Sequence, residues 1–341
     1  MKICWITSYP PKQSGIANYS EDIVTEMQKL EKVDIFLWNY EGLVIKLFAP
    51  LVNLWRLRRV MRDYDIVHIQ YVLGENMPLF LPVVCILKGK AKVVITSHED
   101  YRNLPFARLF ILFHNIFYLC ADRMMVHTRY HRELFWKSLQ KRTVIIPFGT
   151  ESFPQVKTKK HTVLMQGFIN TWKGHDLAVQ AISIVRESVP DVVLIIAGKI
   201  HNRRYWKSVE RKIKELGIEH NVDLMTGFIP TNVFQRLIAQ SEIVVMPYKR
   251  ITMSAILSDV VGHAKPCVLS DLPSFRDYTK GKAIYFKAGD SNDLARKLSA
   301  LLRSDADKKK MIRFFQKLAG EYSWPMIAKL TLESYGKIVR R

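Results

Sequence analysis

Short apolar segments alternate with longer amphipathic segments along the whole chain. Near-continuous apolar runs such as DIVHI and KVVIT are typical of parallel strands that are covered on both faces. In the first half the pattern predicts strands at Ile3–Thr7, Val33–Trp38, Asp65–Ile69, Lys92–Ser97, Arg123–His127 and Thr143–Ile146. The helices predicted between them include Ile16–Leu30 and Tyr130–Leu139.

The second half repeats this alternation. Strands are predicted at His161–Met165, Val192–Ala197, Val222–Met225, Ile243–Met246, Cys267–Leu269 and Ala283–Phe286. Helices are predicted between them at Gly174–Glu187, Arg204–Leu216, Asn232–Ala239 and Ser254–His263. After Asp290 the pattern is helical only.

Two consecutive series of alternating strands and helices predict an α/β protein with two doubly wound domains. We expect the first domain at residues 1–150 and the second at 161–322. The segment 151–160 between them is polar and contains proline, as linkers do. Residues 323–341 should form a helix that packs back on the first domain. Open α/β sheets bind ligands at the carboxyl ends of their strands, so the site is expected in a cleft between the domains.

Composition narrows the class of protein and its partners. Of the 341 residues 48% are hydrophobic, which excludes a disordered chain, and the net charge is +21. Charge of that size admits nucleic acid, an anionic membrane surface or a phosphate-bearing substrate as partner. No nucleic-acid motif occurs and the basic residues are dispersed, so nucleic acid is not expected. The four scattered cysteines indicate buried free thiols in the cytoplasm. The apolar run 104–121 is interrupted by polar residues, so no membrane span is predicted.

Two segments of the second domain carry candidate phosphate chemistry. The first, QGFINTWKG at 166–174, follows a strand and opens a helix, which places Lys173 at a helix N-terminus that already favours an anion. The second, at 244–268, has a basic loop between a strand and a helix that starts near Ser254. Hydroxyls of Thr252 and Ser254 and the N–H groups near Ala255 could bind a ligand there, and Asp259 could accept hydrogen bonds from ribose. Each segment is also compatible with an ordinary capped helix and a solvated lysine.

Together these segments resemble the retaining glycosyltransferases of family 4, and the order of elements extends the resemblance over nearly the whole chain. The family has the GT-B fold, with two facing Rossmann-like domains, and transfers a sugar from a nucleotide-diphosphate donor. Its strand–Gly–loop–Lys-Gly–helix segment contacts the donor pyrophosphate and corresponds to Gly167 and Lys173-Gly174. Its small-x-Pro turn corresponds to 264–266. In the first domain DIVHIQY, TSHED, ADRMMVHT and VIIPFGTE recur in the family's order.

The chain departs from the common family pattern at three places. The arginine that many relatives carry near the lysine is replaced by Phe168 or Asn170, and the first of the paired glutamates is Ile251. The second is Asp259. A variant branch lacks the first glutamate and has a Pro-Tyr…Ser-Gly arrangement, which this chain resembles at 247–248 and 254–255. The resemblance implies donor-binding roles for Gly15, Gly167, Asn170, Lys173, Arg250, Thr252, Ser254, Ala255 and Asp259.

The resemblance also implies catalytic roles for His98 and Lys173. His98 ends a strand in TSHED and would contact the transferred sugar or the acceptor, although a lone histidine at a strand end is more often structural. A side chain at Gly15 would block the approach of the backbone to the donor. The family's front-face, retaining reaction needs no protein nucleophile, and no acidic pair for a metal stands out, so neither metal nor cofactor is expected.

The acceptor is expected to be a lipid-linked or membrane-proximal saccharide. The segment 54–62 separates apolar from arginine positions on a helix that also carries Trp55, and 106–119 is rich in aromatic residues. Such helices suit the inner face of a membrane, although packing on the sheet with a solvated basic face is equally compatible. Two other functions stay open: a catalytically silent nucleotide-sugar-binding scaffold, and a sugar-nucleotide epimerase of the related fold, which would need no acceptor.

Overall fold

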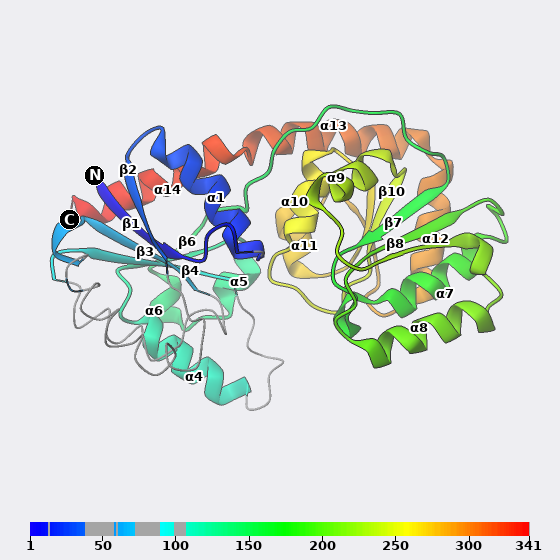
Figure 1. The fold of residues 1–341 in the computed structure, drawn as a ribbon, viewed down its shortest axis with the longest axis horizontal. Coiled ribbons are helices and arrows are strands. Elements are labelled where there is room, and N and C mark those ends of the chain that lie inside the picture. The colour runs from blue at the N-terminus through cyan, green and yellow to red at the C-terminus, as the bar shows by residue number, and fades with distance from the viewer. Residues whose placement is uncertain (13, 38–57, 59–60, 72–88, 99–106, 341) are drawn as a thin grey trace. The chain divides into compact units, whose positions relative to one another are not determined.

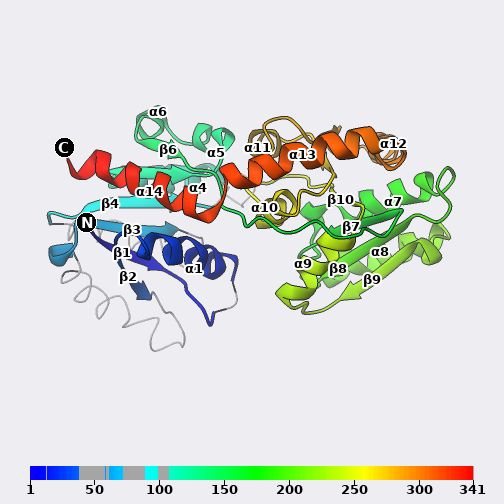
Figure 2. The same ribbon diagram turned by 90° about the horizontal axis from the view of Figure 1, so that it is seen from above.

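The computed structural model describes residues 1–12, 14–37, 58, 61–71, 89–98 and 107–340. The chain forms two compact units, one of Met1–Gly149 with Trp324–Arg341 and the other of Thr150–Ser323. Each unit contains a parallel sheet with helices on both faces (Figure 1, Figure 2).

The sheet of the first unit consists of β1 (Lys2–Thr7), β2 (Lys32–Leu37), β3 (Ile66–Tyr71), β4 (Lys92–Ser97), β5 (Arg123–Val126) and β6 (Thr143–Ile145). The strand order is β2-β1-β3-β4-β5-β6, and neighbouring strands are parallel. β3 is buried along its whole length because it lies inside the sheet with both faces covered.

The helices of this unit are α1 (Gly15–Gln28), α4 (Ala107–Tyr118), α5 (Arg129–Glu133), α6 (Lys137–Gln140) and α14 (Trp324–Val339). The C-terminal helix α14 packs against α1, as Figure 1 shows, although the two are far apart in the sequence. Alternate residues of β3 point to opposite faces. Val67, Ile69 and Tyr71 enter a hydrophobic cluster with Tyr118 of α4. His68, on the other face, contacts Tyr335 of α14.

The sheet of the second unit consists of β7 (Thr162–Gln166), β8 (Val193–Gly198), β9 (Val222–Thr226), β10 (Ile243–Met246), β11 (Cys267–Ser270) and β12 (Ile284–Phe286). It is also parallel, with the order β12-β11-β10-β7-β8-β9. Its helices are α7 (His175–Val185), α8 (Arg203–Glu215), α9 (Thr231–Gln240), α10 (Ala255–Gly262), α11 (Pro273–Tyr278), α12 (Ser291–Arg303) and α13 (Asp305–Glu321), and two short 3₁₀ turns are Thr171–Lys173 and Glu219–Asn221. Helix α7 packs between α8 and α12, while α10 contacts α9 and α13.

The predicted fold class is confirmed, and each predicted strand occurs within one or two residues of its expected ends. The helix predicted over Tyr130–Leu139 is wrong as a single element, because α5 and α6 are separated by a break. Asn115 Oδ1 of α4 accepts a hydrogen bond of 2.9 Å from the backbone N–H of Trp136, which takes that N–H away from a continuous helix. Helix α11, which begins with Pro273, was not predicted.

The aromatic-rich stretch at 106–119 includes α4. Most of the arginine-rich segment 54–62, including Trp55, lies outside the described residues. No helix within the described part of the chain is long and apolar enough to cross a membrane.

Candidate functional site

The second unit has a topological switch point where β7 and β10 pair. The chain proceeds from β7 to one edge of the sheet through β8 and β9, and from β10 to the other edge through β11 and β12. The loops that leave two such strands at their carboxyl ends diverge and open a ligand crevice. Here these loops begin at Gly167, directly after β7, and at Pro247, directly after β10.

Gly167 is required by its close neighbours and by its backbone conformation. Its φ is +109°, in the region that favours glycine. A Cβ at this position would lie 2.5 Å from Cδ1 of Ile256 in α10 and 3.4 Å from Nζ of Lys173. The missing side chain therefore brings the predicted phosphate lysine, the end of β7 and the first turn of α10 together.

The ammonium of Lys173 lies in an aromatic environment behind this glycine. Its Nζ donates a hydrogen bond to the hydroxyl of Tyr248, and it lies 3.9 Å from the ring centroid of Tyr248 and 4.6 Å from that of Trp172. Lys173 is 5% exposed, and burial lowers the pKa of its ammonium to about 7. The ring faces stabilise the charged form. Among the residues that the structure describes, no carboxylate pairs with this buried ammonium, which suits an anionic ligand.

Gly174 lets the loop that carries Lys173 approach the end of β10. Its φ is +78°, and a Cβ would lie 2.0 Å from the carbonyl oxygen of Pro247. The backbone N–H of Lys249 donates a hydrogen bond of 2.8 Å to the carbonyl of Trp172, which ties the two loops together. The residues that precede α7 and those that follow β10 therefore pack directly against each other.

The other predicted donor residues of this unit lie along the same edge. Asn170 caps the 3₁₀ turn Thr171–Lys173, and its Oδ1 accepts a 2.7 Å hydrogen bond from the N–H of Thr171. Ser254 is the N-cap residue of α10 but its side chain makes no capping hydrogen bond. Thr252 and Ser254 are buried. Arg250 and Ala255 are exposed, so each is accessible to a ligand.

Asp259 is engaged with α9. Its Oδ1 accepts a 3.1 Å hydrogen bond from Gln235, whose Oε1 lies 2.6 Å from Nε2 of His263. Burial raises the pKa of Asp259 to about 6. A donor ribose would therefore share this carboxylate with Gln235, and the ribose contact stays a prediction.

In the first unit His98 follows β4, and Gly15 begins α1. His98 Nε2 lies 2.6 Å from Oε1 of Gln70, and its ring contacts Tyr19 and His127 at centroid distances of 5.3 and 5.0 Å. Burial holds the pKa of His98 well below its usual range, so the ring is neutral near pH 7. A Cβ at Gly15 would meet no described atom within 4 Å, so packing within the protein does not require glycine there. The predicted cleft between the units stays a prediction.

Several neighbours of these residues were not predicted from the sequence. Neither the contact of Tyr248 with Lys173 nor that of Ile256 with Gly167 was expected, because contacts between separate loops leave no local pattern. His68 and Gln70 were missed although a signal existed, since both are polar residues on the same face of an otherwise apolar strand, IVHIQY. Such residues need buried hydrogen-bond partners.

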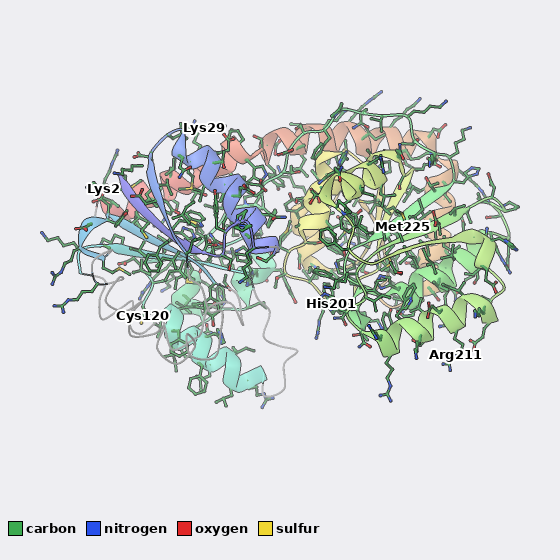
Figure 3. All side chains as sticks on the ribbon, viewed as in Figure 1. Lys2, Lys29, Cys120, His201, Arg211 and Met225 are labelled. Carbon is green, nitrogen blue, oxygen red and sulfur yellow. The ribbon has the colours of Figure 1, made fainter. Side chains whose placement is uncertain are left out.

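The described ranges contain no ligand set for a metal ion: no group of three or more histidine, cysteine or acidic side chains there could hold one. Phe168, directly after Gly167, is 54% exposed and stacks on His201 at a centroid distance of 4.1 Å. His201 is labelled in Figure 3.

Two family models match the chain. The model of glycosyltransferase family 4 matches residues 17–151, and that of glycosyl transferases group 1 matches residues 149–317. A GDP-mannose-dependent α-(1-6)-phosphatidylinositol monomannoside mannosyltransferase from Mycolicibacterium smegmatis is 21% identical in an alignment 277 positions long, and the alignment covers 70% of this chain and 70% of the relative.

Solved structures share the fold. HepE from Anabaena, in complex with UDP and glucose, has a TM-score of 0.75 and 16% identity over 99% of this chain and 100% of its own. A glycosyltransferase from Rickettsia africae has a TM-score of 0.79 and 14% identity over 100% of this chain and 99% of its own. The predicted family, fold and enzyme class are confirmed: the chain belongs to glycosyltransferase family 4 and has the GT-B fold.

Proposed function

We propose that this enzyme transfers a sugar, with retention of configuration, from a nucleotide-diphosphate donor to a lipid-linked or membrane-proximal saccharide. The observation that carries the donor assignment is the buried ammonium of Lys173 at the switch point of the second unit, behind Gly167. The pyrophosphate would lie over Gly167, and Lys173 with the first N–H groups of α10 would stabilise the charge of the leaving diphosphate.

The sugar-transfer chemistry needs no protein nucleophile in this proposal. The leaving diphosphate stays on the face that the acceptor attacks, and its oxygen takes the acceptor's proton. His98 would contact the transferred sugar or the acceptor from the first unit. The proposals of retention and of independence from metal both rest on the family resemblance. Retention is tested by determining the anomeric configuration of the product by NMR.

Nucleotide binding provides the first test of the donor site. We expect one of UDP, GDP and ADP to raise the melting temperature, because a ligand at 100 times its dissociation constant stabilises the folded state by about 2.7 kcal/mol. The similar HepE structure is a complex with UDP, and the mannosyltransferase relative is, by its name, dependent on GDP-mannose. Uracil and guanine are therefore both candidates for the base of the donor. If none of the three shifts the transition, the donor assignment is wrong.

A catalytically silent nucleotide-sugar-binding scaffold is the alternative function. Its motivation is the replacement of the first family glutamate by Ile251. The two functions differ in turnover, since an active enzyme hydrolyses its donor slowly even without acceptor. Measurable release of nucleoside diphosphate from the preferred nucleotide sugar would eliminate the scaffold, whereas binding without release would favour it.

An apolar face on α4 supports a membrane-proximal acceptor. Leu109, Leu112, Phe113 and Ile116 recur at helical spacing and are 42–51% exposed. Arg108, also exposed, precedes them in the first turn, and the chain carries a net charge of +21. An apolar stripe on a strongly cationic protein suits insertion into an anionic membrane surface. The mannosyltransferase relative acts, by its name, on a phosphatidylinositol mannoside.

Replacing Phe113 with aspartate should therefore weaken binding to vesicles that contain anionic lipid. We expect a loss of about tenfold or more, because an aromatic side chain contributes about 1.5–3 kcal/mol when it leaves water. Sedimentation with vesicles at low salt measures the change. Phe228→Asp in the second unit, where Phe228 is 71% exposed, provides a control with the same change of charge. Equal binding of all three proteins would exclude α4 as the membrane contact.

The Gly15→Ala variant tests whether Gly15 contacts the donor or is needed only for the stability of the fold. Since no described atom lies within 4 Å of the added methyl group, the melting temperature should stay within about 2 °C of the wild type, as expected for a surface change within 0.5 kcal/mol. If Gly15 lets the backbone approach the donor, kcat/KM for the nucleotide sugar should nevertheless fall about tenfold or more. Unchanged kinetics would remove Gly15 from the donor site.

A further inference from the structure

A chain of buried polar side chains connects His98 with the C-terminal helix inside the first unit. His98 Nε2 lies 2.6 Å from Oε1 of Gln70, and Nε2 of the same amide lies 3.0 Å from Nε2 of His68. His68 Nδ1 is hydrogen-bonded to the hydroxyl of Tyr335 in α14. Gln70, His68 and Tyr335 are each 0% exposed. A fully buried polar chain of this kind is costly unless each group is paired, so its geometry is strictly determined.

The chemistry of the Gln70 amide determines where the histidine protons lie. The oxygen of an amide only accepts, so the nitrogen of His98 that faces it, Nε2, carries the hydrogen. The amide nitrogen only donates, so the nitrogen of His68 that faces it, also Nε2, carries the lone pair. Neutral His68 then has its hydrogen on Nδ1 and donates it to Tyr335. Burial lowers the pKa of His68 to about 3, which keeps this ring neutral.

The ring of His68 is fixed on its other sides as well. The indole of Trp5 stacks on it at a centroid distance of 4.0 Å and an interplanar angle of 16°. The hydroxyl of Thr96 lies 2.8 Å from the same Nε2 and can donate to it. Turning over the Gln70 amide would require His68 to move its hydrogen to Nε2, and the hydroxyl hydrogens of Thr96 and Tyr335 to reorient with it.

We propose that Gln70 is a positioning residue for sugar transfer, which fixes His98 as the tautomer with hydrogen on Nε2 and a lone pair on Nδ1. His68, held by Tyr335, fixes the orientation of the amide. In this tautomer Nδ1 of His98 accepts hydrogen bonds and does not donate them. This inference rests on the role proposed for His98, but the tautomer can be measured without turnover.

Long-range ¹H–¹⁵N NMR spectra of the histidine rings in the full chain test the inference. The His98 signals are assigned by their loss in His98→Gln. In the wild type we expect the pattern of hydrogen on Nε2 for His98 and on Nδ1 for His68. In Gln70→Met, which keeps the length of the side chain without its amide, His98 should show a mixture of both tautomers. We expect kcat to fall about 10- to 100-fold, with a smaller change in the donor KM, because a misplaced ring loses its alignment with the reacting groups.

Tyr335→Phe removes a single hydroxyl at the remote end of the chain and keeps the shape of the ring. It should release the Nδ1 hydrogen of His68 and shift the His68 spectrum, and through Gln70 that of His98. Gln140→Met removes another glutamine in this unit, one that donates to the carbonyl of Phe135, and should change neither spectrum nor rate.

The outcomes separate the inference from the proposed function. A His98 spectrum in Gln70→Met identical to that of the wild type overturns the positioning role, whatever the rate. An unchanged His98 spectrum in Tyr335→Phe overturns the coupling through His68. A mixed tautomer with unchanged kcat supports the positioning of the ring by Gln70 and instead overturns the assignment of His98 to the reaction.

Discussion

Replacing Lys173 with alanine should lower kcat about 10²- to 10³-fold and abolish thermal stabilisation by the preferred nucleotide. Removing one preorganised group that stabilises developing charge costs about 2.7–4 kcal/mol of transition-state stabilisation. Here the ammonium is buried between Tyr248 and Trp172, and a water molecule in its place would not restore the positive charge. Steady-state kinetics with the nucleotide sugar and thermal unfolding with the nucleoside diphosphate measure the two effects.

Controls distinguish the loss of charge from a loss of packing. Lys173→Met keeps the length of the side chain and its contact with the rings, and should lose turnover to the same extent as Lys173→Ala. Lys317→Ala changes the charge equally on the exposed face of α13 and should leave both measurements unchanged. If Lys173→Met retains the wild-type rate, the ammonium does not stabilise the leaving diphosphate.

The pH dependence of nucleotide affinity should report the same ammonium. Burial lowers the pKa of Lys173 to about 7, so the group is charged below that pH and neutral above it in the free enzyme. A bound diphosphate favours the charged form of Lys173. Above about pH 7 the lysine of the free enzyme is neutral, so nucleotide binding must be accompanied by the uptake of one proton by Lys173. Affinity should therefore decrease above about pH 7, by at most tenfold for each pH unit. The titration of the nucleotide's own phosphate is measured separately on the free nucleotide by ³¹P NMR, and its contribution is subtracted.

Gly174→Ala should destabilise the protein by about 3 kcal/mol, a large effect for the addition of one methyl group. Its φ of +78° is unfavourable for alanine, and the added carbon would lie 2.0 Å from the carbonyl oxygen of Pro247, which is backbone and cannot rotate away. The loop would have to separate from the end of β10, and the position of Lys173 would change with it. Denaturant unfolding followed by circular dichroism measures the loss.

Gly320→Ala provides the matched control for this substitution. Gly320 lies in the last turn of α13, and a Cβ there would meet no described atom within 4 Å. Alanine is about 0.5–1 kcal/mol more favourable than glycine in a helix interior and less so in a last turn, so this variant should be at least as stable as the wild type. Gly174→Ala within 0.5 kcal/mol of the wild type would contradict the close approach of Pro247.

Periodicity sufficed for the strands because each is a short apolar run bounded by turn residues. Runs such as IVVM and IVHIQY are buried on both faces, so their composition reflects their environment directly. It failed for Tyr130–Leu139, where the local pattern is helical but Asn115, 21 residues earlier, accepts the hydrogen bond from Trp136. A hydrogen bond from another element leaves no trace in a periodicity.

The sequence by itself determined the family, the alternation of strands and helices, and the candidate phosphate segment with Gly167 and Lys173-Gly174. Local order along the chain carries these features. Only the tertiary structure decided that Tyr248, 75 residues from Lys173, binds its ammonium, and that Tyr335, 267 residues from His68, completes the chain to His98. The physical reason is that a buried polar group needs a partner, and the strand order and helix packing select which distant residue provides it.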